Sequence, residues 1–203
     1  MSPDDPGRRR SSRSTAAILE AALALAAERP YPQVTVESIA ARAGVSKATI
    51  YRWWPSRGAV LVDALAARNA RDVAYGLPDT GDLRGDLAVV LRGVVDELAD
   101  PAWDALLRAL TVETLQDDTL RSQVLATIFT PQLEAFAARF AVARAAGQVG
   151  DDVDDLAALE LVVAPVFHRW QQGSGSLTHA YADGVAARAC RALAPADRPD
   201  AEG

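Results

Sequence analysis

The residues best suited to chemistry lie close together in the sequence, in the stretch of residues 35–57, TVESIAARAGVSKATIYRWWPSR. Hydroxyl, basic and aromatic side chains are interspersed there with apolar ones. The hydroxyl and basic side chains donate hydrogen bonds to anions, and a helix that starts at Ser or Thr also presents free backbone N–H groups to anions. The chemistry predicted for this stretch is therefore the binding of anions such as phosphate.

The rest of the sequence is poor in groups for catalysis or metal binding. One cysteine, Cys190, excludes a disulfide framework and a multi-thiolate site, and two histidines, His168 and His179, leave little for a histidine site. No GxSxG, Walker or HExxH pattern occurs. The acidic run at residues 151–155 favours the start of a helix over a metal site. We therefore expect no enzyme activity, no cofactor and no bound metal.

Charge is distributed unevenly along the 203 residues. The net charge of −6, taken alone, argues against a nucleic-acid partner. Residues 1–75, however, hold eleven Lys or Arg against seven Asp or Glu, a balance of +4, whereas residues 76–203 hold ten against twenty, a balance of −10. This asymmetry predicts a basic head on an acidic body. The head begins with an arginine-rich arm: Arg8, Arg9, Arg10 and Arg13.

Composition places the chain among soluble globular proteins of one or two small domains, since 50% of residues are hydrophobic and 24% charged. No run of eighteen apolar residues occurs, and no apolar run follows the polar N-terminus. We expect no membrane association and a cytoplasmic location.

Helical spacing of apolar residues recurs throughout and predicts an all-α protein of about nine helices. The first is expected from about Ser14 to Pro30, two short ones after Thr35 and Ser46, and a fourth after Ser56. The turn-rich residues 76–81 form a candidate domain boundary. Three further helices are expected from about residues 82, 101 and 118, the last of them kinked or split by Pro131, and two more on either side of the link at residues 173–176.

The two short helices, joined by a turn that contains Gly44, have the spacing of a helix-turn-helix, whose second helix enters the DNA major groove. In that second helix Lys47, Thr49, Arg52 and Trp53 are unsuited to a core. The residues able to face inward are Val45, Ile50 and Trp54.

This stretch resembles the TetR family of bacterial transcriptional repressors (TetR/AcrR-type helix-turn-helix), whose DNA-binding segment typically reads T-x-x-x-I-A-x-x-A-G-V-S-x-x-T-x-Y-x-x-F-x-x-K. The chain departs from it at Trp54 and Arg57, which keep the chemistry of Phe and Lys. The resemblance implies a three-helix DNA-binding head and a helical body for ligand binding and dimerisation. We therefore divide the chain into a disordered basic arm (1–12), a helix-turn-helix domain (13–60) and an effector-binding and dimerisation domain (61–203). The matching residues are Thr35, Ile39, Ala40, Ala43, Gly44, Val45, Ser46, Thr49 and Tyr51.

The resemblance also implies which residues meet DNA. Phosphate contacts are implied for Thr35, Ser46, Tyr51 and Arg57, and positions nearest the bases for Lys47, Ala48, Thr49 and Trp53; Arg52 completes the predicted surface. General chemistry agrees, because Arg57 can fork onto phosphate oxygens and Lys47 can bond to guanine O6 or N7.

The body offers a candidate ligand pocket and a candidate dimer interface. Its aromatic residues can line an apolar cavity or simply fill a core, and the resemblance favours a pocket. The pocket candidates are Trp103, Leu107, Phe129, Phe136, Phe167, His168 and Trp170. The last two helices are expected to form an antiparallel hairpin for self-association, with Leu159, Val163, Val166, Val185 and Ala189 at the interface.

The function that these features predict is that of a ligand-responsive repressor. It would bind a pseudo-palindromic double-stranded DNA operator as a homodimer through its last two helices, and a small, largely apolar effector would release it. The alternative is a helical module that sequesters small molecules or binds proteins, with weak or no operator binding.

Overall fold

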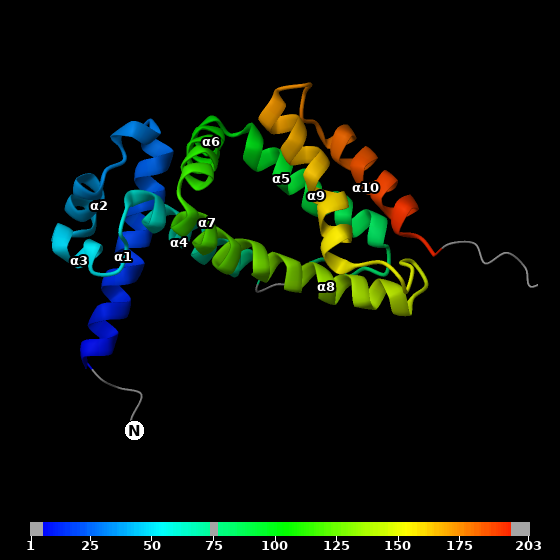
Figure 1. The fold of residues 1–203 in the computed structure, drawn as a ribbon, viewed down its shortest axis with the longest axis horizontal. Helices are drawn as coiled ribbons and strands as arrows, with labels where there is room; N and C mark the ends of the chain where they lie inside the picture. Colours follow the sequence, from blue (N-terminus) through cyan, green and yellow to red (C-terminus); the bar gives the residue numbers. More distant parts are fainter. Residues whose placement is uncertain (1–5, 74–76, 196–203) are drawn as a thin grey trace, which may run out of the picture. The chain divides into compact units, whose positions relative to one another are not determined.

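The computed structural model describes the backbone of residues 6–73 and 77–195, with side chains for 12–70 and 77–195. This part of the chain contains ten α-helices and no strand, which confirms the all-α class (Figure 1). The helices are α1 (Pro6–Glu28), α2 (Val36–Ala43), α3 (Lys47–Tyr51), α4 (Arg57–Val73), α5 (Leu83–Ala99), α6 (Pro101–Gln116), α7 (Asp118–Val124), α8 (Thr130–Ala145), α9 (Asp155–Gln172) and α10 (His179–Leu193).

The helix predicted over residues 118–146 is divided in two, which is why ten helices replace nine. Between α7 and α8 the segment Leu125–Phe129 is π-helical, and the Thr130 N–H donates to the Leu125 carbonyl, five residues back. Pro131 has no N–H to continue an α-helical ladder, so the helix widens by one residue just before it. The expected break at Pro131 is confirmed and takes the form of this π-helical segment.

The first helix is longer than predicted. It begins at Pro6, so residues 6–12 of the arm expected to be disordered are helical. Proline is favoured in the first turn of a helix, and the three arginines that follow are good helix formers. The prediction for residues 1–5 lies outside the described residues.

The helices pack as two units. Unit 1 comprises Met1–Ala74 and Asp100–Thr130, and unit 2 comprises Tyr75–Ala99 and Pro131–Gly203. In unit 1, α1 packs against α2 and α4, and α6 and α7 add Leu106, Leu110 and Leu120 to the same hydrophobic core (Figure 1). The helix-turn-helix domain predicted at residues 13–60 therefore shares its hydrophobic core with two later helices, α6 and α7.

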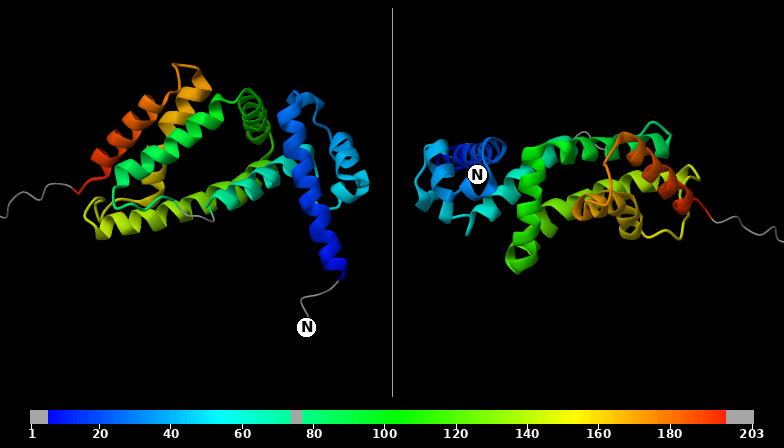
Figure 2. Two further views of the ribbon diagram at one scale, coloured as in Figure 1. Left: turned by 180° about the vertical axis from the view of Figure 1, so that it is seen from behind. Right: turned by 90° about the horizontal axis from the view of Figure 1, so that it is seen from above.

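In unit 2, α10 lies beside α5 and α9, and α9 and α10 form the predicted antiparallel hairpin (Figure 2). A buried ion pair fixes α8 within this unit: Arg139 Nη2 donates to Asp86 Oδ2 at 2.7 Å, and Thr80 Oγ1 donates to Asp86 Oδ1 at 2.8 Å. Burial alone would raise the pKa of Asp86, but these hydrogen bonds hold it below its usual value.

Local signals explain α2 and α3. The Thr35 hydroxyl accepts from the Ser38 N–H, and the Ser38 side chain accepts from the Thr35 N–H, a reciprocal cap that starts α2. Gly44 ends it in the left-handed conformation, with φ of 66°. The Ser46 hydroxyl then accepts from the Thr49 N–H and starts α3. Both short helices therefore begin as predicted, and α2 also ends as predicted, whereas α3 already ends at Tyr51.

Substitutions of two adjacent residues test how α3 is held. Ile50 is fully buried, whereas the Tyr51 side chain is 53% exposed. We expect Ile50→Ala to lower the free energy of unfolding by about 2–4 kcal/mol, because it leaves a cavity in the core. Tyr51→Ala is expected to change it by less than about 1 kcal/mol. Urea unfolding followed by circular dichroism measures both values, and equal losses would contradict this packing of α3.

Candidate nucleic-acid interface

One side of α3 is buried and the other is open to solvent. Ile50 and the following Trp54 face the core, and Trp54 is only 5% exposed. Trp53 is 62% exposed, so the two adjacent tryptophans point in different directions, as predicted. The solvent side carries Lys47, Ala48, Tyr51, Arg52 and Trp53.

The hydroxyl groups predicted to meet DNA are part of the helix caps. Ser46 is exposed at the start of α3, and its Oγ lies 2.9 Å from the Oγ1 of half-buried Thr49. Thr35 is half-buried at the start of α2. These caps position the N-terminal amides of two helices on the same small unit, and such amides favour anions. The structure thus places Thr35 at the start of α2 and Ser46 and Lys47 at the start of α3, and Lys47 reaches back to Glu37 in the first turn of α2.

Arg57 is the exception among the predicted phosphate contacts. Its guanidinium points into unit 1, where Nη1 donates to the carbonyls of Tyr31 and Val34, each at 3.3 Å. Nη2 donates to Glu113 Oε1 of α6 at 3.1 Å. Three acceptors inside the unit already hold the group, so the contact of Arg57 with phosphate stays a prediction that the structure does not support.

The surroundings of Arg57 were missed in the sequence. The guanidinium lies 4.3 Å from the centre of the Tyr31 ring, a cation–π contact. Burial beside the Glu113 carboxylate raises the pKa of Tyr31 well above its usual value. Gly58 allows α6 to approach, since a Cβ there would lie 2.5 Å from Glu113 Oε2. A glycine in the first turn of α4 was the one local signal for this contact.

A second polar link ties the same helix to α7. Trp54 Nε1 donates to Asp63 Oδ2 at 2.7 Å, and Gln123 Nε2 donates to Asp63 Oδ1 at 2.6 Å. Gln123 Nε2 also donates to the Ala59 carbonyl at 2.9 Å. The indole that anchors the end of the helix-turn-helix is thus connected through α4 to α7.

Two acidic residues of the head pair with its basic side chains. Lys47 Nζ lies 3.0 Å from Glu37 Oε1 in the first turn of α2, and Arg42 of α2 pairs with Glu28 of α1. The hydrogen bond from Lys47 holds the pKa of Glu37 below its usual value. The hydrogen bond from Glu37 in turn raises the pKa of Lys47. Neither acidic partner was predicted, because nothing in the sequence joins residues ten or fourteen positions apart across a turn.

The residues predicted to line a ligand pocket are divided between the two units. Trp103, Leu107 and Phe129 are half-buried in unit 1. In unit 2 Phe136 and Trp170 are core residues, whereas Phe167 and His168 are exposed. The pocket that they would form stays a prediction.

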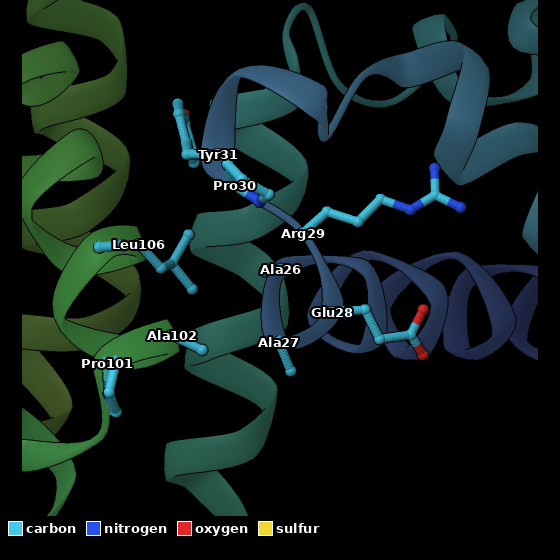
Figure 3. Close-up of a pocket in the computed structure, with 10 residues that line it drawn as sticks. Ala26, Ala27, Glu28, Arg29, Pro30, Tyr31, Pro101, Ala102 and Leu106 are labelled. Carbon is cyan, nitrogen blue, oxygen red and sulfur yellow. The ribbon is translucent and has the colours of Figure 1, made fainter.

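A cleft of about 330 Å³ lies elsewhere in unit 1, between the end of α1, residues 29–31 and the start of α6 (Figure 3). Its walls include Ala26, Pro30, Ala102 and Leu106, and none of the predicted pocket residues lines it. The side chains of Glu28 and Arg29 extend away from α6 at its edge (Figure 3).

Burial within the chain corrects most of the predicted dimer interface. Leu159 and Val166 of α9 and Val185 and Ala189 of α10 are at most 2% exposed, so they belong to the core of unit 2. Val163 is half-buried. The apolar periodicity of the two helices therefore reports their packing within one chain.

The acidic, histidine and cysteine side chains of the described residues do not gather into a metal site. Those residues contain no group of three or more His, Cys, Asp or Glu able to hold a metal ion. Asp154, in the acidic run, accepts from the Ala157 N–H and caps α9. No helix among these residues is long and apolar enough to cross a membrane.

The chain has a compact helical head with two capped short helices, an exposed basic and aromatic face, and a second helical unit. These features define the class of helix-turn-helix transcriptional regulators. Residues 18–64 match the family described as bacterial regulatory proteins, tetR family, and residues 77–189 match the tetracyclin repressor-like C-terminal domain. The chain belongs to the TetR family of DNA-binding transcriptional regulators.

Two named transcriptional regulators are similar to this chain over most of its length. The DNA-binding transcriptional repressor TetR of Mycobacteroides abscessus is 32% identical over 85% of this chain and 89% of its own length. The uncharacterized HTH-type transcriptional regulator YdeS of Bacillus subtilis is 29% identical over 80% of this chain and 81% of its own length.

Solved structures share the fold. The TetR family transcription regulator SCO0332 is 27% identical, with a TM-score of 0.78 over 90% of this chain and 99% of its own. The transcriptional regulator FadR from Bacillus subtilis, solved in complex with stearoyl-CoA, is 19% identical, with a TM-score of 0.65 over 86% of this chain and 97% of its own.

Salt dependence of DNA binding distinguishes Arg57 from Lys47. We expect Arg57→Met to lower the free energy of unfolding by about 1–3 kcal/mol, because it removes hydrogen bonds of a charged group. The slope of log affinity against log salt should stay within about 0.3 of the wild-type value. Lys47→Gln should reduce the magnitude of this slope by about 1 per bound subunit and leave stability nearly unchanged. Fluorescence anisotropy with a labelled duplex measures the slopes, and a reduced slope in Arg57→Met would return Arg57 to the phosphate contacts.

Proposed function

We propose that this regulator is a ligand-responsive repressor that binds a pseudo-palindromic operator as a homodimer. The observation that carries the proposal is the solvent face of α3, where a tryptophan that is 62% exposed lies beside exposed basic residues. Trp53 and Thr49 are proposed to lie against base edges in the major groove. Lys47 beside them and the helix N-termini at Thr35 and Ser46 are proposed to bind the phosphates. A regulator of chromosomal genes works in the cytoplasm.

Self-association is proposed to use the solvent side of the α9–α10 hairpin. The buried residues of α9 leave an opposite face that carries Leu161, Ala164 and Phe167, with Leu161 41% and Phe167 38% exposed. Apolar residues aligned on one face of an exposed helix favour burial against another molecule. A symmetric pair of such faces would relate two heads by a two-fold axis, which requires an operator with a dyad.

Effector binding is proposed to act through α4. This helix is held to α6 by the Arg57–Glu113 pair and to α7 by the Asp63–Gln123 hydrogen bond. A small, largely apolar effector, bound among the helices that follow α4, would shift these tethers and change the separation of the two recognition helices. A coupling of about 1–3 kcal/mol would weaken operator binding by about 5- to 150-fold.

Gel shifts with the DNA upstream of the protein's own gene, repeated at several salt concentrations, test operator binding. We expect a specific complex whose footprint has a dyad with half-sites about 10 base pairs apart, or a multiple of this. Trp53→Ala should weaken this complex about tenfold or more while changing binding to random duplex little, because Trp53 is proposed to contact bases. No specific complex at any salt concentration would favour the alternative of a sequestering or protein-interaction module.

The dimer face is tested with a matched pair of exposed valine and leucine positions in unit 2. Leu161→Glu on α9 should weaken self-association at least about tenfold, because it places two carboxylates in the interface. Val142→Glu on α8, where the side chain is 48% exposed, should leave it unchanged. Sedimentation equilibrium measures both constants, and a dimer unaffected by Leu161→Glu would exclude this face.

A further inference from the structure

Glu37 lies on the solvent side of the helix-turn-helix, directly beside the residues expected to meet DNA. Its Oε1 is 3.0 Å from the Nζ of Lys47, the first residue of α3. The two side chains are 60% and 55% exposed, so the pair crosses the turn between α2 and α3 in water.

The carboxylate also lies at the start of α2. The hydrogen bond from Lys47, then the backbone N–H of Glu37 itself, and further the Thr35 hydroxyl hold the pKa of Glu37 below its usual value. An anion at this end of a helix is favoured by the free amides and by the helix dipole. The donors around Glu37 are therefore the same groups that are proposed to receive a DNA phosphate.

We propose that Glu37 is an internal competitor of DNA: in the free protein its carboxylate holds the position on Lys47 that a phosphate takes in the complex. DNA binding then exchanges one anion for another on the same ammonium group. This inference rests on the proposed DNA face of α3. In this proposal Glu37 itself makes no contact with DNA, and its charge lowers the affinity of the protein for DNA.

The competition has a definite signature. All duplexes carry the same phosphates, so Glu37 should weaken binding to DNA of every sequence alike. Its effect is electrostatic, so it should be largest at low salt and shrink as salt screens the charges. Removing its charge leaves one more net positive charge at the interface, which steepens the salt dependence.

The experiment compares Glu37→Gln with Glu20→Gln, which removes one negative charge from an exposed position on α1 of the same unit. Anisotropy with a random 30-base-pair duplex, and with the operator, is measured from low to moderate salt. We expect Glu37→Gln to bind both duplexes about two- to fivefold more tightly at the lowest salt, the range of an exposed ion pair. The slope against log salt should steepen by up to about 1 per bound subunit. Glu20→Gln should change affinity less than twofold.

Lys47→Gln and the double variant complete the test. With Lys47 absent there is no ammonium to release, so Glu37→Gln should gain clearly less affinity in that background than in the wild type. An equal gain in both backgrounds, an equal gain in Glu20→Gln, or a gain on the operator alone would overturn the competition. Wild-type protein that binds no duplex in a salt-dependent way would instead refute the proposed DNA face itself. Both substituted residues are exposed, and circular dichroism checks that every variant is folded.

Discussion

The position of the whole helix-turn-helix depends on one guanidinium group. Arg57 bonds to the carbonyls of Tyr31 and Val34, which lie in the connection between α1 and α2, and to Glu113 of α6. Carbonyls of a short connection can accept further hydrogen bonds, and a half-buried charge needs several partners. The same group meets both needs, because the connection supplies acceptors and the arginine supplies a fork of donors. The first turn of α4 thereby holds the connection that leads from α1 into α2.

The two tethers of α4 make the head one mechanical unit with two later helices. Glu113 reaches the first tether from α6, and Gln123 reaches the second, Asp63, from α7. The hydrophobic core is continuous in the same place, since Leu106, Leu110 and Leu120 pack with the N-terminal helices. A displacement of α6 or α7 therefore has two polar routes to the recognition helix, and hydrogen bonds lost along either route would be costly to replace.

The sequence predicted what local signals control and failed where a partner lies far along the chain. The α2–turn–α3 bounds followed from Thr35, Gly44 and Ser46, whose roles need only neighbours. Arg57 was assigned to phosphate because its acceptors are 23, 26 and 56 residues away. The buried faces of α9 and α10 were mistaken for an interface, since apolar spacing shows which side is covered but not by what. Pro131 predicted a break in the helix, but it did not predict that the break would be the π-helical segment Leu125–Phe129.

The net charge of residues 1–75 overstates the positive charge that DNA would meet. The balance of +4 in residues 1–75 already counts Glu28 and Glu37, the partners of Arg42 and Lys47, whereas Glu113, the partner of Arg57, lies outside these residues. Each ion pair lowers the attraction of its basic group for a polyanion, and the net charge of −10 in residues 76–203 adds repulsion. In the proposed complex, affinity then comes from groups that act at contact distance: helix N-termini, hydroxyls and the exposed Trp53. Such groups are effective only when the turn holds them in register with the groove, so a head rigidified by Arg57 and a face with modest net charge are two parts of one requirement for sequence-selective binding.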